Sequence, residues 1–246
     1  MNLSIQIIPF TKLALAFIPV AIVIGILFRW TRGYKTEIYG FSRMLGQLLL
    51  VGYFLSTVFE SDSAWIVLLV IIVMVFASSS IALRTVKEQW RQLYWRSFVA
   101  ILIGGGVVLT LITQGVLELE PWYLPSYFIP LAGMIFANAM NSVSLAADRL
   151  YAEAGRDVPF EKARNIALRA SLIPMTNALF AVGLVSLPGM MTGQILSGVS
   201  PLIAVRYQIM VMCMVFGAAG ISSAIFLTLV KTDFPAPETI ENIPPT

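Results

Sequence analysis

Long apolar stretches alternate with short polar segments along most of the chain. A helix needs roughly 17–25 mostly apolar residues to cross the hydrocarbon core of a bilayer, and seven stretches with few or no charges approach or reach that length. This pattern predicts an all-α polytopic membrane protein with about seven transmembrane helices. The predicted spans are residues 10–28, 42–59, 64–83, 97–117, 122–147, 170–189 and 207–230.

One apolar stretch does not fit a single span. Residues 170–205 carry no charge, which is too long for one transmembrane helix and too short for two helices with a comfortable loop. We expect one spanning helix there, followed by irregular structure. Whether residues 190–205 re-enter the membrane stays open at this point.

Basic residues are concentrated in alternate loops, which predicts the orientation of the chain. Fourteen of the sixteen Lys and Arg residues fall on one side, and only Lys12 and Arg206 fall on the other. Cytoplasmic loops carry the excess of Lys and Arg in membrane proteins. We therefore expect the N-terminus outside, the C-terminus in the cytoplasm, an odd number of spans, and a location in the cell inner (plasma) membrane.

Composition excludes a soluble globular protein. Of the 246 residues, 58% are hydrophobic and 12% are charged, against about 45–50% and about 25% in soluble domains. The sequence contains no histidine and one cysteine, Cys213, so one chain cannot supply a disulfide framework or a His- or Cys-based zinc or haem site. The net charge is +3, and in so apolar a chain we take the positions of the basic residues as a signal of membrane topology. We therefore expect no nucleic-acid partner.

Two regions are predicted along the chain. Residues 1–230 are expected to form a single transmembrane domain, and the first span is expected to stay as an anchor because no basic segment precedes it and no cleavage site follows it. Residues 231–246 read KTDFPAPETIENIPPT. This segment is polar and proline-rich, which predicts a disordered cytoplasmic tail.

The sequence lacks the usual means of powering transport by itself. No G-x-x-x-x-G-K-[ST] phosphate-binding loop is present. Every Asp and Glu lies in a loop, at the end of a span or in the tail, whereas ion-coupled carriers usually keep an ionisable group within the bilayer. The chain is therefore not expected to hydrolyse ATP, and a secondary transporter is disfavoured.

The longest basic loop, residues 148–169, carries a candidate docking helix. Pro159 suits the first position of a short helix, and Glu161 places a negative charge at its positive end. Phe160, Ala163 and Ala167 recur at helical spacing beside a basic face. Two interpretations remain open: a helix that lies on lipid headgroups, and a helix that docks on a partner ATPase.

Polar and helix-breaking residues mark a candidate translocation pathway. Asn138, Asn141 and Ser142 lie within a predicted span, where they serve either as contacts between helices or as pathway residues. The segment 183–193 contains a proline and three glycines, which indicates either a break at membrane depth or an extracellular turn. Its candidate pathway residues are Ser186, Pro188, Gly189, Met190, Met191 and Thr192.

Two further groups of residues favour packing. Gly104, Gly105 and Gly106 lie inside an apolar span, which favours close helix contacts over phosphate binding. The eleven methionines offer soft metal ligands, but adaptable packing is the preferred interpretation.

Three segments give the chain a family resemblance: VGLVSLPGMMTG at 182–193, continuing through Ser200-Pro201 and 206–211; IPLAGMIFANAM at 129–140; and GQLLLVGY at 46–53. In these segments the sequence resembles the FetB/YbbM family of ABC-transporter permeases. Members of that family are described as bacterial iron exporters and are related to plant aluminium-tolerance half-transporters.

The resemblance implies a permease subunit that forms a homodimer and pairs with two copies of a separate ABC ATPase subunit. ATP and Mg would then be bound by the partner, and no cofactor by this chain. The coupling loop would comprise Glu153, Ala154, Gly155, Pro159, Phe160, Glu161 and Lys162. Relatives resemble L-G-A-T-P where this chain reads Gly155-Arg-Asp-Val-Pro159, so the choice of ATPase is less predictable.

The resemblance also implies export of iron or another metal, although the sequence shows no strong metal site and its metal ligands stay unknown. Within the predicted spans the chain offers amides, hydroxyls, thioethers and freed carbonyls. Three alternatives remain: an ABC permease for a non-metal solute such as a nucleotide sugar, an ATP-independent channel or carrier, and a non-transporting membrane scaffold.

Overall fold

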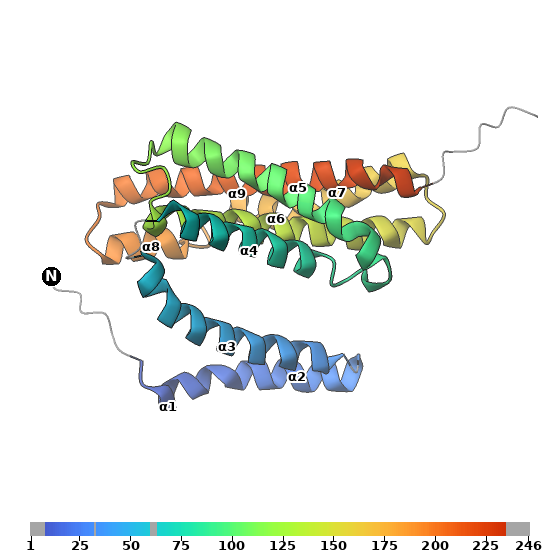
Figure 1. Ribbon diagram of the computed structural model, residues 1–246. Helices are drawn as coiled ribbons and strands as arrows, with labels where there is room; N and C mark the ends of the chain where they lie inside the picture. The colour runs from blue at the N-terminus through green and yellow to red at the C-terminus, as the bar shows by residue number, and fades with distance from the viewer. Residues whose placement is uncertain (1–7, 32, 60–62, 235–246) are drawn as a thin grey trace, which may run out of the picture. The chain divides into compact units, whose positions relative to one another are not determined.

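The protein is helical throughout the part of the chain that can be described. The computed structural model describes residues 8–31, 33–59 and 63–234. These residues form helices and no β-strand (Figure 1). The prediction of an all-α fold is confirmed. The chain divides into two compact units, Met1–Ser61 and Asp62–Thr246, which are described separately below.

The first unit is a helical hairpin. After the short α1 (Phe10–Leu13) and the 3₁₀ helix η1 (Ala14–Ala16), α2 (Phe17–Trp30) leads through a tight turn into α3 (Tyr34–Phe59). The hydroxyl of Thr31 donates to the Leu27 carbonyl at 3.0 Å and accepts a hydrogen bond from the Gly33 amide at 3.2 Å. No residue of α2 is buried, so its apolar side chains are available to lipid.

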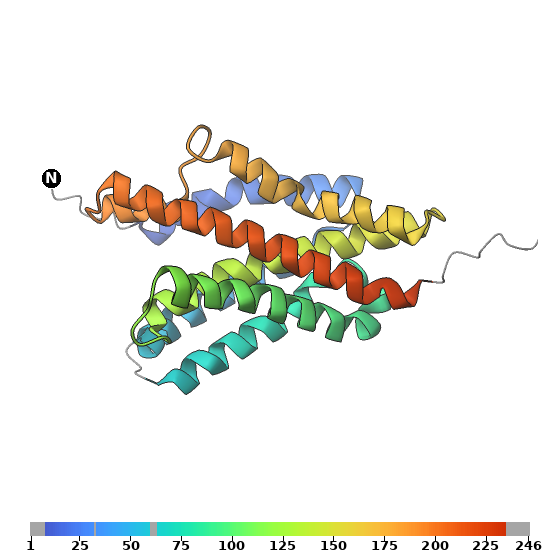
Figure 2. The same ribbon diagram turned by 90° about the horizontal axis from the view of Figure 1, so that it is seen from above.

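The second unit is a bundle of long helices with one short helix (Figures 1 and 2). A 3₁₀ turn, η2, precedes α5, and a π-helical segment, η3, continues it. The elements are α4 (Ala64–Ala82), η2 (Lys87–Gln89), α5 (Trp90–Thr110), η3 (Leu111–Val116), α6 (Pro125–Ala154), α7 (Phe160–Ala181), α8 (Gly189–Leu196), α9 (Pro201–Leu229) and η4 (Val230–Asp233).

Helix α6 is the centre of this bundle, because it packs against α4, α5, α7 and α9. Its side chains at Ile135, Phe136 and Val143 are almost completely buried. Two glycines of α5 let the neighbouring helices approach. A Cβ at Gly104 would lie 2.7 Å from the backbone nitrogen of Ser222 on α9, and one at Gly105 would lie 2.7 Å from the Phe136 ring.

The predicted close packing is therefore confirmed at Gly104 and Gly105. It is wrong at Gly106, where an added Cβ would meet nothing within 4 Å. The three glycines are consecutive on a helix that turns about 100° per residue, so they cannot all face the same neighbour.

A chain of serine hydrogen bonds joins α6, α7 and α9. The hydroxyl of Ser223 donates to the hydroxyl of Ser142 at 2.7 Å, and Ser142 donates to the backbone carbonyl of Ser171 at 3.2 Å. Ser142 is only 2% exposed. In an apolar interior such hydroxyls need partners, so these bonds hold the three helices in one register.

We expect Ser142→Ala to lower the free energy of unfolding by about 0.5–1.5 kcal/mol. The substitution removes the acceptor of Ser223 and the donor to Ser171. Ser144→Ala is the matched control, since Ser144 lies on the same helix and outside this chain of bonds. Thermal unfolding of the purified variants in detergent measures the difference, and equal unfolding temperatures would contradict the helix-joining role.

Among the described residues, five helices are long and apolar enough to cross a membrane: Thr11–Trp30, Ala64–Ala82, Lys87–Val116, Pro125–Ala154 and Pro201–Asp233. They match five of the seven predicted spans. The predicted span 42–59 falls on α3. The predicted span 170–189 falls on α7 only as far as Ala181, where the helix ends, and the N-terminal parts of both helices carry several charges. In both helices a charged N-terminal segment therefore precedes the apolar segment.

The structure corrects the expected organisation of residues 160–230. The helix that begins after Pro159 is not short: α7 runs from Phe160 to Ala181. The helix ends there because a turn follows it, in which Gly183 has φ of +83°. The Val185 amide closes this turn by donating to the Ala181 carbonyl at 2.8 Å. The expected irregular segment instead contains α8, and the last helix begins at Pro201 rather than 207.

The C-terminal segment also differs from the prediction. The disordered tail was expected to begin at Lys231, but residues 230–233 form η4 and Phe234 follows it in contact with the bundle. These residues gain order from ion pairs and ring contacts that the tail's composition does not reveal. The rest of the predicted tail, 235–246, lies outside the described residues.

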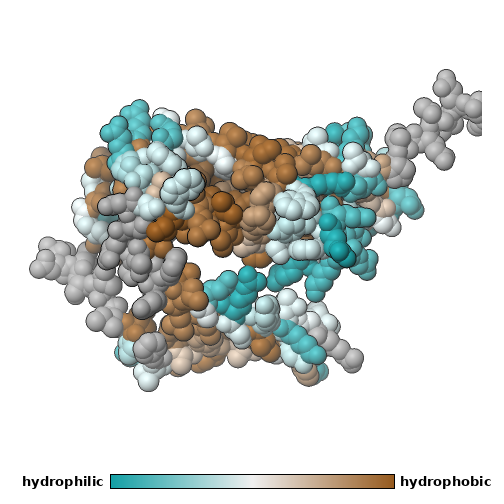
Figure 3. Space-filling view, in the orientation of Figure 1, coloured by the Kyte–Doolittle hydropathy of each residue, from teal (hydrophilic) through white to brown (hydrophobic). Residues whose placement is uncertain are grey.

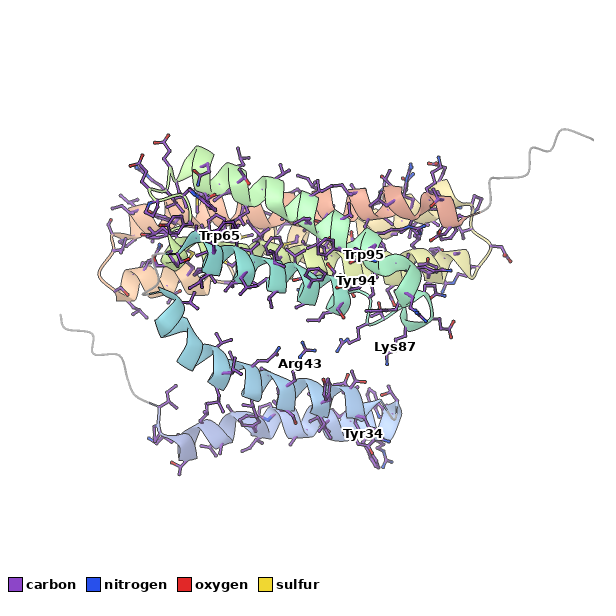
Figure 4. The ribbon with its side chains drawn as sticks, viewed as in Figure 1. Tyr34, Arg43, Trp65, Lys87, Tyr94 and Trp95 are labelled. Carbon is purple, nitrogen blue, oxygen red and sulfur yellow. The ribbon has the colours of Figure 1, made fainter. Side chains whose placement is uncertain are left out.

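Hydrophobic surface covers the middle of the second unit and polar surface gathers toward its ends (Figure 3). Figure 4 shows Trp65 toward one end of this unit and Lys87 toward the other, as expected for a helix such as α4 that crosses between them. Trp90 and Tyr94 pack together near the Lys87 end, with ring centroids 4.9 Å apart. Aromatic side chains in such positions suit the interface between membrane and water.

Candidate functional site

Five helix ends meet at one end of the second unit: the ends of α4, α6 and α9 and the starts of α5 and α7 (Figure 1). We call this the basic end. Ten Lys and Arg residues lie at or next to this end. They are Arg84, Lys87, Arg91, Arg96, Arg149, Arg156, Lys162, Arg164, Arg169 and Lys231.

The turn between α6 and α7 is the most elaborate structure at the basic end. Helix α6 ends at Ala154, and Asp157 adopts φ of +58°, a left-handed conformation that Asp tolerates better than most residues. The Pro159 carbonyl accepts the amides of Lys162 and Ala163 at 3.0 and 2.9 Å. Pro159 is therefore the N-cap of α7, and Phe160 is its first residue.

Glu153 anchors this turn. Its carboxylate is 5% exposed and accepts Arg149 at 2.7 Å and Arg156 at 3.5 Å. A carboxylate in the last turn of a helix is disfavoured by the helix dipole, and the two guanidinium groups offset that effect. The Val158 amide also donates to the Glu153 backbone carbonyl at 3.3 Å, so one residue holds both sides of the turn.

The C-terminal segment packs onto the same turn. The ring of Phe234 lies 5.0 Å from that of Phe160 and 5.9 Å from that of Tyr151. Asp233 forms an ion pair with Arg96 of α5, and Lys231 lies 3.5 Å from Glu161. The turn, α5 and η4 thus form one surface with three aromatic rings and mixed charges.

The structure brings together the seven residues predicted for ATPase coupling. Glu153, Ala154 and Gly155 close α6, and Pro159 to Lys162 open α7. Lys162 is exposed and Phe160 is half-buried. Their role in coupling stays a prediction, but they share one turn at the basic end, with Glu153 buried beneath it.

The apolar stripe of α7 points into the protein. Ala163 and Ala167 are fully buried, and α7 packs against α6 and α9. The interpretation of this segment as a helix lying on lipid headgroups is therefore wrong. The first turn of α7 places Phe160, half-buried, at the surface of the basic end.

The structure separates the residues predicted for the translocation pathway. Ser142 is buried in the serine contacts, and the Asn138 side chain donates to the Met134 carbonyl of its own helix at 2.8 Å. Asn141 is exposed. Ser186 is exposed in the turn after α7, beside Leu184, which is 90% exposed.

Pro188, Gly189 and Thr192 shape the start of α8. Pro188 is its N-cap, Gly189 its first residue, and the Thr192 hydroxyl donates to the Pro188 carbonyl at 3.1 Å. The two methionines that follow face different grooves. Met190 lines one of about 300 Å³ with residues of α6, and Met191 lines one of about 380 Å³ with residues of α7 and α9. Neither Asn138 nor Asn141 lines these two grooves.

Sequence reasoning missed several residues at these sites. The surface at the basic end is completed by four residues that were not predicted: Arg96, Tyr151, Asp233 and Phe234. The one available signal was Phe234, an isolated aromatic residue in a polar segment. Gln208 lines the groove that Met191 lines. It is the only amide side chain in the last helix, which could have marked it.

These features define a polytopic integral membrane protein with a structured surface at the basic end of its bundle. The chain belongs to the UPF0014 family, because the family model described as "Uncharacterised protein family (UPF0014)" matches residues 10–234. No solved structure matches the chain.

Named relatives include bacterial and plant membrane proteins. The "UPF0014 membrane protein slr1647" of Synechocystis is 39% identical, with 70% of this chain and 73% of the relative aligned. The "Probable iron export permease protein FetB" of Escherichia coli is 33% identical over 91% of both chains. The "Protein ALUMINUM SENSITIVE 3" of Arabidopsis thaliana is 31% identical over 83% of this chain and 80% of the relative. The resemblance found from sequence motifs is confirmed.

Proposed function

We propose that this chain is the membrane subunit of an ABC transporter that exports iron or another metal, driven by ATP hydrolysis in a separate ATPase subunit. The observation that carries the proposal is the α6–α7 turn. It lies at the basic end, is held by Glu153, and leaves Phe160 half-exposed at the first position of α7. A rigid helix start with an aromatic anchor suits insertion into a cleft of a partner protein.

The basic end supports a cytoplasmic location for this turn, since Lys and Arg are enriched on the cytoplasmic side of membrane proteins. With α3 and α7 crossing the membrane in addition to the five helices above, the N-terminus lies outside and the C-terminus lies in the cytoplasm. Helix α8 then lies on the outer side. Its eight residues span only about 12 Å at about 1.5 Å per residue, so it does not cross the membrane.

The proposed transporter contains two copies of the permease and two ATPase subunits, in the inner (plasma) membrane. The ATPase subunits bind ATP and Mg. Metal as the cargo is supported by the name of the Escherichia coli relative, which aligns over 91% of this chain. The permease contributes the pathway and the docking surface, and the bilayer contacts its exposed apolar side chains.

Reconstitution into liposomes tests this function. Vesicles with the basic end outward contain the permease alone, the ATPase alone, or both, and the uptake of Fe(II) and other metal ions is measured after ATP is added outside. We expect metal uptake only with both subunits and ATP. Metal flux through the permease alone would favour an ATP-independent channel or carrier, and ATP-driven uptake of a nucleotide sugar without metal would overturn the cargo.

A further inference from the structure

A groove between α7, α8 and α9 is lined by three sulfur-containing side chains and by Gln208. It has a volume of about 380 Å³. Three of its lining side chains carry sulfur, namely Met191, Met212 and Cys213, and Gln208 is its amide. We call it the sulfur groove. The rest of its lining is apolar apart from backbone at Gly183.

The positions on α9 place these side chains on one helix face. Val205, Gln208 and Met212 are separated by three and four residues, and Ile209 and Cys213 are separated by four. Residues three and four apart are neighbours on a helix surface. Met191 reaches the same groove from α8, which packs against α9. Sulfur-containing side chains from two helices therefore line one groove.

Gln208 has an unmet hydrogen-bonding requirement. Its side chain is 6% exposed, and among the described residues its Oε1 has no hydrogen-bond partner. An unpaired buried acceptor costs about 1–3 kcal/mol relative to a satisfied one. Since the oxygen accepts and cannot donate, the missing partner is a cation or a donor.

We propose that the sulfur groove binds a soft transition-metal ion, best represented by Cu(I), through the sulfur atoms of Met191, Met212 and Cys213 with the Gln208 oxygen as a further ligand. Thiolate and thioether ligands select soft metals such as Cu(I), whereas hard cations take oxygen ligands. The Cys213 thiol gives up its proton to a water molecule of the incoming hydrated ion when it binds metal. Cys213 is exposed on α9, so this ligand is not enclosed by the helices of the bundle.

This site differs from metal sites built from His, Cys, Asp and Glu. No group of three such residues that could hold a metal ion is found in the described ranges 8–31, 33–59 and 63–234. Two thioethers and a neutral amide add no fixed negative charge to the groove.

The inference rests on the proposed function only where it gives the sulfur groove a role in transport. The metal site itself is tested by a binding measurement on the full-length permease without the ATPase. The purified chain in detergent is titrated with Cu(I) under anaerobic conditions against a coloured Cu(I) chelator, and with Fe(II) in parallel. We expect one Cu(I) per chain, bound at least about tenfold more tightly than Fe(II). Sulfur ligation is checked by X-ray absorption at the copper edge.

Three variants and a control locate the site. Cys213→Ser, Met191→Leu and Met212→Leu should each weaken Cu(I) binding by at least about tenfold. Met210→Leu should leave it unchanged, because Met210 lies on the same helix and does not line the sulfur groove. Unfolding temperatures of all four variants distinguish lost ligation from lost folding.

The proposal is overturned if the wild type binds no Cu(I), if Fe(II) binds more tightly, or if Met210→Leu weakens binding as much as Met212→Leu. These outcomes leave the ATPase-driven transport proposal standing, since liposome uptake is measured separately. Conversely, Cu(I) binding in the sulfur groove without ATP-dependent uptake would support the site and contradict the transport function.

Discussion

Gly104→Ala is expected to destabilise the protein by about 2–3 kcal/mol, in the upper part of the range for overpacked cores. The new Cβ would lie 2.4 Å from the Ser222 hydroxyl oxygen, 2.7 Å from its backbone nitrogen and 2.8 Å from its Cα. The hydroxyl can rotate away, but the backbone atoms can clear the methyl group only if α5 and α9 separate. The better helix propensity of Ala returns at most about 1 kcal/mol.

Gly106→Ala is the matched control on the same helix. Nothing lies within 4 Å of its added Cβ, so the substitution should be neutral or slightly stabilising. Thermal unfolding in detergent, followed by the fraction of protein that stays monodisperse, should place Gly104→Ala roughly 5–10 °C below the wild type for a chain of this size. Equal unfolding temperatures for the two variants would show that α5 and α9 are not in such close contact.

Phe160→Asp is expected to weaken the binding of the ATPase subunit by at least about 30-fold. The aromatic ring is the apolar anchor of the proposed docking surface, and replacing an anchor typically costs at least about 2 kcal/mol, or about 30-fold in affinity. Asp is a favourable residue in the first turn of a helix, so α7 should still form. The contact with the Phe234 ring at 5.0 Å is lost.

Two controls separate the lost ring from the added charge. Phe160→Leu keeps an apolar side chain and should retain most of the binding. Asn165→Asp adds the same charge to an exposed position of α7 and should change little. Affinity is measured by co-purification of the two subunits and by stimulation of ATP hydrolysis. Unchanged binding in Phe160→Asp would remove the α6–α7 turn as the docking site.

The α6–α7 turn is held in place by contacts within the protein. Glu153 with its two arginines holds the end of α6, and the Phe234 ring covers part of Phe160 and Tyr151. Preorganised surfaces lose less conformational entropy on binding. A turn held in this way can also transmit a displacement directly into α6 and α7, whose buried serine contacts continue to α9.

The sequence by itself determined the helical class of the protein and most of its helix positions. A membrane-spanning helix needs a minimum length of apolar residues, and Lys and Arg are concentrated in the loops. Both requirements can be recognised from consecutive residues in the sequence. The sequence also located the α6–α7 turn, because Pro159 and Glu161 favour the start of a helix through local effects of their own side chains.

Only the tertiary structure decided which residues meet between helices. Three sets of contacts show this: Gly104 with Ser222, the serine bonds from Ser223 through Ser142 to Ser171, and Phe234 on Phe160. They join positions 29 to 118 residues apart, which is farther than any local sequence pattern reaches. A helical period gives the face of a side chain but not the neighbour it faces. For that reason the arrangement of Gln208 and the three sulfur-containing side chains around one groove is visible only from the packing of α8 against α9.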